Sequence, residues 1–351
     1  MAILFRRFIH FVLLLFVPAT LFAATLRIGV LGLFHPVELI VSPTPGSVLV
    51  IDASGRQVIL EDGRKAYLRI DGRQVVCRIG DEVLSGPGVR GQSRQGGPAD
   101  FVLSIPGKIT RQYRGELEVS ASEGSLIPVV TIDTEVAVAS AVEAESPPGA
   151  PFEALKAQAI VTRSYYLAGR RHADFDFCDT THCQFLRGPA AVDSPAVTAT
   201  AATRGLALTY EGTVIPTLFS ASCGGRTRSL AEVGLSSHGY PYYSVVCSYC
   251  LRHAVRWQRV LNLDRAEYLL GRSPTEADRL RIDRSGGWNT IPGNNFELEV
   301  VGESVVIQGK GQGHGIGLCQ MGAFGMAADG STFREILDHY FPNTSLSARD
   351  N

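Results

Sequence analysis

The sequence has almost no excess of charge of either sign, because 33 Lys and Arg residues nearly balance 34 Asp and Glu residues among its 351 residues. A nucleic-acid-binding domain normally carries clustered, excess Lys and Arg, so nucleic acid is excluded as the expected partner. Beyond the N-terminal segment, the sequence has no apolar run that approaches the ~20 residues of a membrane span and no internal repeat. It also lacks the His-Glu-x-x-His motif, which argues against a zinc amidase or peptidase. With 45% hydrophobic and 19% charged residues, the chain is expected to be globular.

Residues 1–24 have the composition of an export signal. Arg6 and Arg7 provide the positive start, residues 8–22 form an apolar run, and Ala23 and Ala24 offer a cleavage site. An uncleaved membrane anchor is the alternative. Either way we expect the rest of the chain to act outside the cytoplasm, in the periplasm, the cell wall or the extracellular space, with no membrane span after signal cleavage.

The remaining sequence predicts an α+β fold of mixed helices and sheets with a smaller β-rich N-terminal unit. Residues 25–110 alternate short β-prone runs with turn residues, and the stretch 86–97 is expected to be an exposed loop. Residues 111–346 form the predicted larger domain, and residues 347–351 a tail.

Three helices are predicted in the larger domain from their end signals. They are a helix from Glu135 capped by Thr134 and ended before Pro147, a helix that starts at Pro151 and reaches Gly169, and a helix with the capping box Thr332 and Glu335 that ends at Tyr340.

Glu145 falls at the end of the first of these helices, where an apolar stripe also ends. The helix C-terminus disfavours negative charge, and Pro147, Pro148 and Phe152 could form an apolar wall, so both effects would raise the pKa of Glu145. A carboxyl that stays protonated near neutral pH is what a glycosidase needs to protonate a leaving oxygen. An ordinary solvated residue at a helix end is the alternative interpretation, and Glu143 is the competing carboxylate.

Three motifs in sequence order resemble those of the SpoIID family of sporulation lytic transglycosylases and amidase enhancers. The first is Glu-Ser-Pro at 145–147, followed by Glu-Ala-Leu-Lys-Ala-Gln-Ala at 153–159 and Arg-Ser-Tyr at 163–165. The second is Ser-Ala-Ser-Cys-Gly-Gly-Arg-Thr at 220–227, with Pro-Tyr-Tyr at 241–243. The third is Gly-Lys-Gly-Gln-Gly-His-Gly-Ile-Gly-Leu-Cys-Gln-Met-Gly-Ala at 309–323. The residue after the glutamate is Ser146, where the family usually has Met.

The resemblance implies an enzyme, with Glu145 as its catalytic residue. It would cleave the β-1,4 bond between N-acetylmuramic acid and N-acetylglucosamine in peptidoglycan glycan strands and leave 1,6-anhydromuramyl ends. The alternative is a non-enzymatic module that binds the wall and stimulates a cell-wall amidase.

Polar residues of the three motifs are expected to bind the substrate. They are Lys156, Arg163, Ser222, Lys310, His314 and Gln320. A solvated helix face is an equally good interpretation of Lys156 and Arg163, and His314 could instead fix a turn by hydrogen bonds.

The glycines at 309, 311, 313, 315 and 317 alternate with other residues. If this segment is extended, one face has no side chains, so a sugar ring or another backbone can approach it closely. The run does not contain Gly-x-Gly-x-x-Gly, which excludes a dinucleotide loop.

Seven cysteines in an exported chain indicate disulfides, metal ligation or both, and the odd number leaves at least one unpaired. His172, Cys178, His182 and Cys183 are ligand types that suit tetrahedral zinc. The family resemblance implies a structural zinc held by His172, Cys178 and Cys183, and a disulfide between the two cysteines is the alternative. Cys247 and Cys250 with His253 form a second group that suggests metal ligands, a disulfide or a redox pair.

Overall fold

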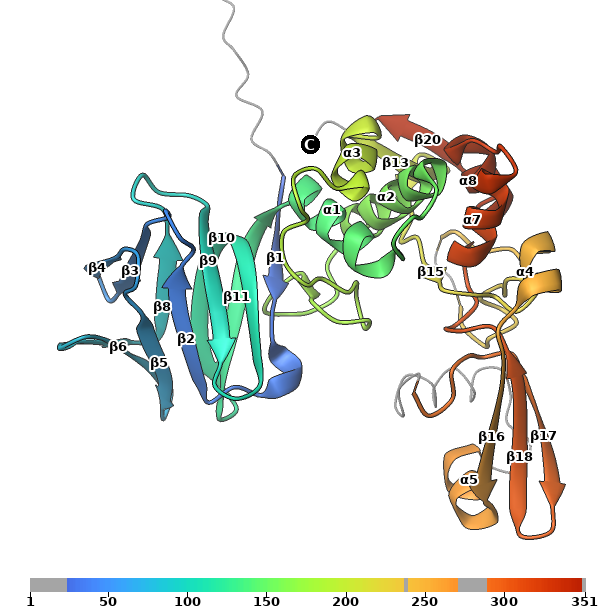
Figure 1. Ribbon diagram of the computed structural model, residues 1–351, viewed down its shortest axis with the longest axis horizontal. Helices are drawn as coiled ribbons and strands as arrows, with labels where there is room; N and C mark the ends of the chain where they lie inside the picture. Colours follow the sequence, from blue (N-terminus) through green and yellow to red (C-terminus); the bar gives the residue numbers. More distant parts are fainter. Residues whose placement is uncertain (1–23, 237–238, 271–288, 349–351) are drawn as a thin grey trace, which may run out of the picture.

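The computed structural model describes residues 24–236, 239–270 and 289–348. The molecule is elongated, with a β-rich N-terminal part at one end, helices in the middle and a small β arm at the other end (Figure 1). The mixed α+β fold and its β-rich N-terminal unit are as expected. No helix within the described residues is long and apolar enough to cross a membrane. The expected signal peptide lies outside the described residues, except for Ala24.

A 12-stranded sheet makes up the N-terminal part and extends beyond it. Its main order is β12-β1-β11-β10-β9-β2-β5-β6-β7, and β3, β4 and β8 branch from β10. The strands are β1 (Thr25–Gly29), β2 (Glu38–Pro43), β3 (Leu49–Ala53), β4 (Arg56–Leu60), β5 (Ala66–Asp71), β6 (Gln74–Ile79), β7 (Glu82–Gly86), β8 (Gly88–Gln92), β9 (Ala99–Ile105), β10 (Ile109–Ser122), β11 (Ser125–Asp133) and β12 (Phe177–Cys178).

Two features of this sheet differ from the sequence-based expectations. The stretch 86–97 is not simply an exposed loop, because β8 lies within it and pairs with both β10 and β3. Gly91 makes this possible, since a Cβ there would press on Leu49, Ile51 and Leu117. The boundary that we placed between residues 110 and 111 falls inside β10, and one core cluster continues from the sheet into the helices that follow.

Three helices of the middle part begin and end close to where their end signals predict: α1 (Thr134–Glu145), α2 (Phe152–Leu167) and α8 (Phe333–Tyr340). The structure adds α3 (Pro195–Ala202), α4 (Ser248–His253) and α7 (Gln320–Ala328), which the sequence analysis did not predict. The capping box of α8 is present as predicted. The cap of α1 is Asp133 rather than Thr134, because the Asp133 carboxylate accepts the N–H groups of Glu135 and Val136.

Short strands tie the helices together. They are β13 (Leu206–Tyr210), β14 (Thr213–Val214), β15 (Phe219–Ser220), β19 (Leu318–Cys319) and β20 (Ser345–Ala348). Strand β15 pairs in parallel with β19, and β20 pairs with β13. Residues 347 and 348 therefore belong to β20 rather than to the tail that we expected.

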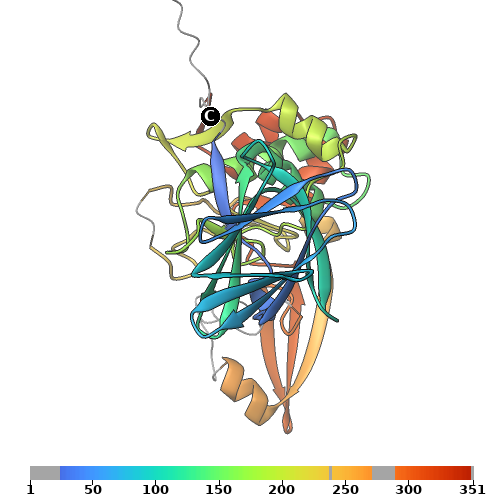
Figure 2. The same cartoon turned by 90° about the vertical axis from the view of Figure 1, so that its left-hand side faces the viewer.

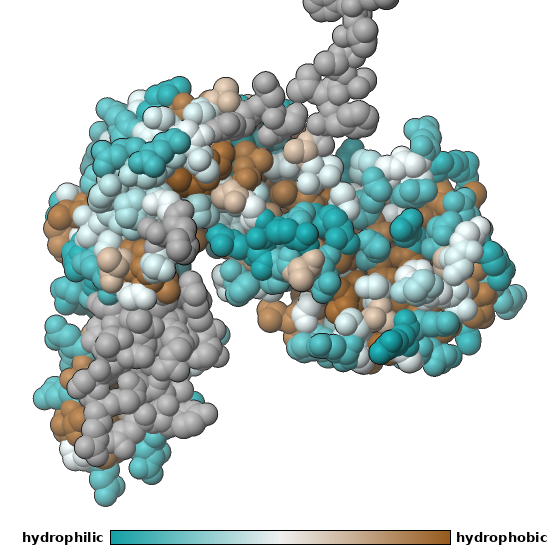
Figure 3. All heavy atoms as spheres, turned by 180° about the vertical axis from the view of Figure 1, so that it is seen from behind, coloured by the Kyte–Doolittle hydropathy of each residue, from teal (hydrophilic) through white to brown (hydrophobic). Residues whose placement is uncertain are grey.

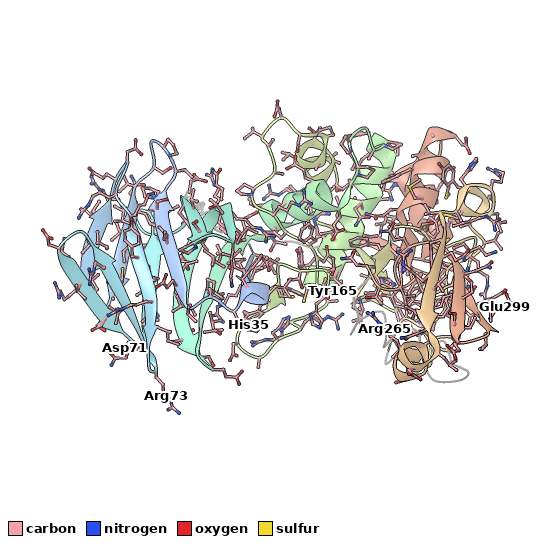
Figure 4. The ribbon with its side chains drawn as sticks, turned by 60° about the horizontal axis from the view of Figure 1, so that its bottom comes forward. His35, Asp71, Arg73, Tyr165, Arg265 and Glu299 are labelled. Carbon is pink, nitrogen blue, oxygen red and sulfur yellow. The ribbon has the colours of Figure 1, made fainter. Side chains whose placement is uncertain are left out.

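A three-stranded sheet forms the arm, in the order β16-β18-β17. Its elements are β16 (Arg256–Asn262), β17 (Phe296–Val301), β18 (Ser304–Lys310) and the adjoining helix α5 (Leu263–Leu270). The view from the N-terminal end shows the arm projecting below the large sheet (Figure 2). Arg265 and Glu299 mark the arm, and Asp71 and Arg73 mark the opposite end of the molecule (Figure 4). The helical middle between these ends carries a hydrophilic patch on its rear face (Figure 3).

Candidate functional site

Glu145 is the last residue of α1 and is half-buried. Its Oε1 accepts a hydrogen bond from the backbone N–H of Phe185 at 3.1 Å. Burial raises the pKa of the Glu145 carboxyl above its usual range, and the Phe185 N–H and the positive charge of Arg187 oppose this rise. The raised pKa that the sequence predicted is therefore confirmed in direction. Pro147 and Pro148, which we expected to wall off the carboxyl, are exposed.

Glu143, the competing carboxylate, has a different environment. It is exposed, and its Oε2 accepts the N–H of Ala191 at 3.3 Å. Glu143 therefore lacks the burial that surrounds Glu145. The structure thus separates two carboxylates that are only two residues apart in sequence.

The C-terminal motif meets Glu145 through Gln320, the first residue of α7. Its side-chain Nε2 donates to the backbone carbonyl of Glu145 at 3.1 Å. The next residue, Met321, donates its N–H to the carbonyl of Ala221 at 3.1 Å. The three motifs therefore converge at the C-terminal end of α1, although Glu145 and Gln320 are 175 residues apart in sequence.

A small pocket lies along the second and third motifs. Its lining includes Ser222, Arg228, Asn294, Lys310 and His314. Three of the six predicted substrate-binding residues thus share one pocket. Ser222 is only 3% exposed, however, and its hydroxyl contacts the Sγ of Cys250 at 3.5 Å.

The glycine run beside this pocket is not extended as we expected. Four of its glycines, Gly311, Gly313, Gly315 and Gly317, have φ between 72° and 89°, a left-handed conformation that favours glycine. The predicted close approach is present, but to backbone: a Cβ on Gly311 would meet the carbonyl oxygen of Ser222 at 2.6 Å. His314 fixes the run, since its Nδ1 accepts the N–H of Ile316 at 3.0 Å.

Arg163 does not have the substrate-binding role that we expected. Its side chain is fully buried and makes two hydrogen bonds of 2.7 Å to the carboxylate of Glu135. Its remaining donors reach the carbonyl oxygens of Thr200 and Leu206. A guanidinium with all these partners holds α1, α2 and the start of β13 together, and no part of it faces solvent.

Lys156 also makes structural contacts. Its Nζ pairs with Glu153 at 2.5 Å and lies over the rings of Phe152 and Phe333. Arg187, rather than Lys156 or Arg163, is the cation whose charge acts on Glu145.

Four metal-ligand side chains form what we call the loop cluster: His172, Cys178, His182 and Cys183. Their ligand atoms all lie within 4.8 Å of one another, and His172 Nε2 is 3.3 Å from the Sγ of Cys183. Both cysteines are free, so the structure does not contain the alternative disulfide between them. His182 completes a four-ligand set that suits one zinc ion.

The large sheet anchors the loop that carries this cluster. Strand β12, which contains Cys178, pairs in parallel with β1. The buried carboxylate of Asp179 accepts the N–H of Leu31 at 3.0 Å and pairs with Arg111 at 2.8 Å. Tyr165 of α2 lies in the middle of the molecule between the two ends (Figure 4). Because Phe185 follows Cys183 by two residues, the same loop presents the N–H that binds Glu145.

A second group, the four-cysteine cluster, consists of Cys223, Cys247, Cys250 and Cys319. The sequence had suggested Cys247 and Cys250 together with His253. His253 is exposed and lies against the ring of Tyr249, outside the cluster.

Comparison with known proteins agrees with this arrangement of motifs. The family model of SpoIID, the stage II sporulation protein, matches residues 122–210. An uncharacterized protein of Brachyspira hyodysenteriae is 31% identical over 268 residues, which cover 67% of this chain and 72% of that protein. The chain belongs to the SpoIID family.

Two Bacillus subtilis relatives have functional names. The amidase enhancer is 25% identical over 280 residues, which cover 58% of this chain and 39% of the relative. Stage II sporulation protein D is 36% identical over 56 residues, or 16% of each protein. The match to the SpoIID family model includes Glu145 and the loop cluster, whereas all four members of the four-cysteine cluster lie beyond it.

Sequence reasoning missed two parts of this SpoIID-family site. The Phe185 N–H is a backbone group, so no side-chain pattern identifies it. Arg187 follows it by two residues and carries an exposed charge like many others. In contrast, Cys223 and Cys319 stood inside two of the quoted motifs and could have been grouped with Cys247 and Cys250.

Proposed function

We propose that this SpoIID-family protein acts on the cell wall as a peptidoglycan lytic transglycosylase, with Glu145 as both acid and base. The observation that supports this most directly is the environment of Glu145. Its carboxyl is half-buried with a raised pKa, its Oε1 is held by the Phe185 N–H, and its carbonyl is held by Gln320. A carboxyl fixed in this way can keep its proton until a leaving oxygen accepts it.

The reaction begins with Glu145 in its protonated form. It donates its proton to the glycosidic oxygen as the bond from that oxygen to C1 of the N-acetylmuramyl unit breaks. The resulting Glu145 carboxylate then removes the proton of the muramyl 6-hydroxyl, and that oxygen forms a bond to C1. No water is consumed and the proton returns to Glu145, so the second carboxylate of hydrolytic glycosidases has no necessary counterpart.

The surface around the small pocket beside the glycine run is the part of the proposed site where the glycan strand would bind. Lys310 is exposed at its edge and brings a positive charge that would attract a muramyl carboxylate. His314 and Gln320 would position the sugar and the end of α1. Ser222 would shape the pocket rather than bind the sugar, since its hydroxyl is directed to Cys250 and its backbone N–H and carbonyl pair with Gln312.

The loop cluster is proposed to bind one structural zinc ion through His172, Cys178, His182 and Cys183. Two sulfur and two nitrogen ligands within 4.8 Å match the donor set of tetrahedral structural zinc. The ion would hold the loop closed so that the Phe185 N–H stays on Glu145. Residues 1–24 are proposed to export the chain, which places this chemistry outside the cytoplasm.

The similarity to the Bacillus subtilis amidase enhancer favours a second candidate function, in which the chain binds glycan and stimulates a cell-wall amidase without cleaving the strand. This alternative does not require a protonated Glu145. The two functions therefore differ in what a single substitution should do.

The deciding experiment is Glu145→Gln, assayed on peptide-stripped glycan strands by mass spectrometry of 1,6-anhydromuramyl ends. The amide preserves the shape of the side chain but has no acidic proton, so turnover should fall by ~10²–10⁴-fold or more while folding is kept. The matched control is Glu143→Gln, which should keep most of the activity. Wild-type protein that releases no such ends but stimulates an amidase would establish the second function, and full turnover by Glu145→Gln would refute the catalytic assignment.

A further inference from the structure

Three segments that are distant in sequence meet at the four-cysteine cluster. Cys223 follows β15, Cys247 caps α4 and Cys250 lies within it, and Cys319 ends β19 and caps α7. All four side chains are buried, with exposed fractions of 3%, 1%, 1% and 0%. Burying four thiols together from separate elements requires a reason beyond ordinary packing.

The spacing of the sulfur atoms fits a single metal ion. All four Sγ atoms lie within 4.8 Å of one another, and Cys250 and Cys319 are 3.5 Å apart. Four sulfurs bound tetrahedrally at ~2.3 Å from one zinc ion would be separated by ~3.8 Å. A disulfide instead needs two sulfurs at ~2.05 Å, and all four cysteines are free.

The surroundings of the sulfurs suit thiolates. The N–H groups of Cys223 and Gly322 point at the Sγ of Cys319, at 3.3 and 3.4 Å. The hydroxyls of Ser222 and Tyr340 lie 3.5 and 3.3 Å from the Sγ atoms of Cys250 and Cys247. Donors of this kind, arranged around the ligands, orient metal-bound sulfur and disperse its negative charge.

We propose that Cys223, Cys247, Cys250 and Cys319 bind one zinc ion in a closed structural site. Each thiol loses its proton on binding, and the four thiolates fill the tetrahedral coordination, so no position is open for water or substrate. The pair Cys247-x-x-Cys250 at a helix start has the ligand spacing of structural zinc sites. Soft thiolate ligands favour zinc over magnesium, calcium or manganese.

The site would hold together the wall of the candidate active site. Cys223 follows Ser222 of the pocket, and Cys319 precedes Gln320, whose amide binds the Glu145 carbonyl. The ion would thus fix the 220–227 motif and the start of α7 against each other. This proposal is independent of the catalytic one, because a binding module would need the same framework.

The test uses full-length protein carrying both Cys178→Ser and Cys183→Ser, which removes the thiols of the loop cluster and leaves the four-cysteine cluster intact. Purified without added metal, this variant should contain about one zinc per chain by elemental analysis. After exchange with Co²⁺, its absorption should show sulfur-to-cobalt charge transfer and the visible bands of a tetrahedral four-thiolate site. Absence of bound metal in both this variant and the wild type, or iron in place of zinc, would overturn the proposal.

Thiol counting gives an independent measurement on the same sample. Seven cysteines less two leaves five, and all five should be alkylated in denaturant with chelator but without reductant. In the native state, alkylation of the cluster should begin only after chelator is added. Mass spectrometry that finds Cys223, Cys247, Cys250 or Cys319 joined in disulfides would favour a redox pair and refute the zinc site.

Discussion

The two clusters of metal-ligand side chains reach Glu145 by different routes. The loop cluster is half-exposed for the most part and lies two residues before Phe185, whose N–H binds the Glu145 carboxylate. The four-cysteine cluster is fully buried and lies one residue before Gln320, whose amide binds the Glu145 backbone carbonyl. We infer that the loop cluster positions the Glu145 carboxylate, whereas the four-cysteine cluster stabilises the fold around it. Damage to the loop cluster should therefore lower activity, and damage to the four-cysteine cluster should lower stability.

The largest effect on activity within this comparison should come from the loop cluster. In the variant with Cys178→Ser and Cys183→Ser, the Phe185 N–H loses its fixed place on Glu145. A misplacement of about 1 Å can cost ~10²-fold in rate, so release of anhydromuramyl ends should fall by about that factor. The thermal midpoint should change little, because the loop is also anchored by β12 and Asp179.

Thr181→Ser is the matched control, since Thr181 is an exposed residue of the same loop. It should leave both rate and melting unchanged. If the double cysteine variant loses the zinc of the loop cluster but keeps full turnover, the loop cluster has no influence on Glu145 and the proposed division of roles fails.

The next effect should be one of stability, at the four-cysteine cluster. Gly322 lies in α7, and a Cβ there would collide with the hydroxyl of Tyr340 and the Sγ of Cys247. Overpacking of a buried site typically costs ~1–3 kcal/mol. We therefore expect Gly322→Ala to lower the free energy of unfolding. Helix propensity acts in the opposite direction, because Ala is favoured over Gly in helices by ~1 kcal/mol. Any loss of stability would thus come from the collision.

Gly32→Ala provides the comparison for that measurement. A Cβ at Gly32 meets nothing within 4 Å, so its effect on denaturant unfolding should stay within about 0.5 kcal/mol. Gly322→Ala protein that is as stable as the wild type and retains its zinc would show that the cluster tolerates expansion, which contradicts the framework role.

The difference between the clusters also explains how far the sequence could predict the site. The loop cluster falls within twelve consecutive residues, so its ligand types were visible as a group. The four-cysteine cluster spans from residue 223 to residue 319, and its ends are brought together by the pairing of β15 with β19 and by the backbone hydrogen bonds beside it. The signal in the sequence for this contact was the presence of Cys223 and Cys319 inside two motifs of the same family.

The same limit applies to the charged residues. The position of Glu145 followed from helix end signals, which are local, and the structure bears it out. The burial of Arg163 did not follow, because its partner Glu135 is on another helix, 28 residues away. Thus local patterns predicted most helix ends and the β-rich N-terminal part, while the partners of individual side chains depended on the tertiary fold.

The smallest predicted effect concerns the pH dependence that the loop gives to Glu145. Burial raises the pKa of this carboxyl, and the positive charge of Arg187 lowers it in part. Arg187→Gln should therefore raise the pKa further. Since the first chemical step needs the protonated acid, activity is lost as pH rises through this pKa, and the loss should move to higher pH in the variant. Because Arg187 is exposed, the displacement should be less than about one pH unit and should shrink as salt is added.

The measurement is the pH–rate profile for release of anhydromuramyl ends at low and high ionic strength. Arg94→Gln is the control, because Arg94 is an exposed arginine of the N-terminal part that pairs with Glu61. Its profile should match that of the wild type. At low salt, Arg187→Gln should retain activity at pH values where the wild type is already declining, and added salt should bring the two profiles together. A shift of the Arg187→Gln profile toward lower pH would mean that the loop does not act on Glu145 through charge. Among the contacts described, the backbone N–H of Phe185 would then be the one remaining way in which the loop acts on Glu145.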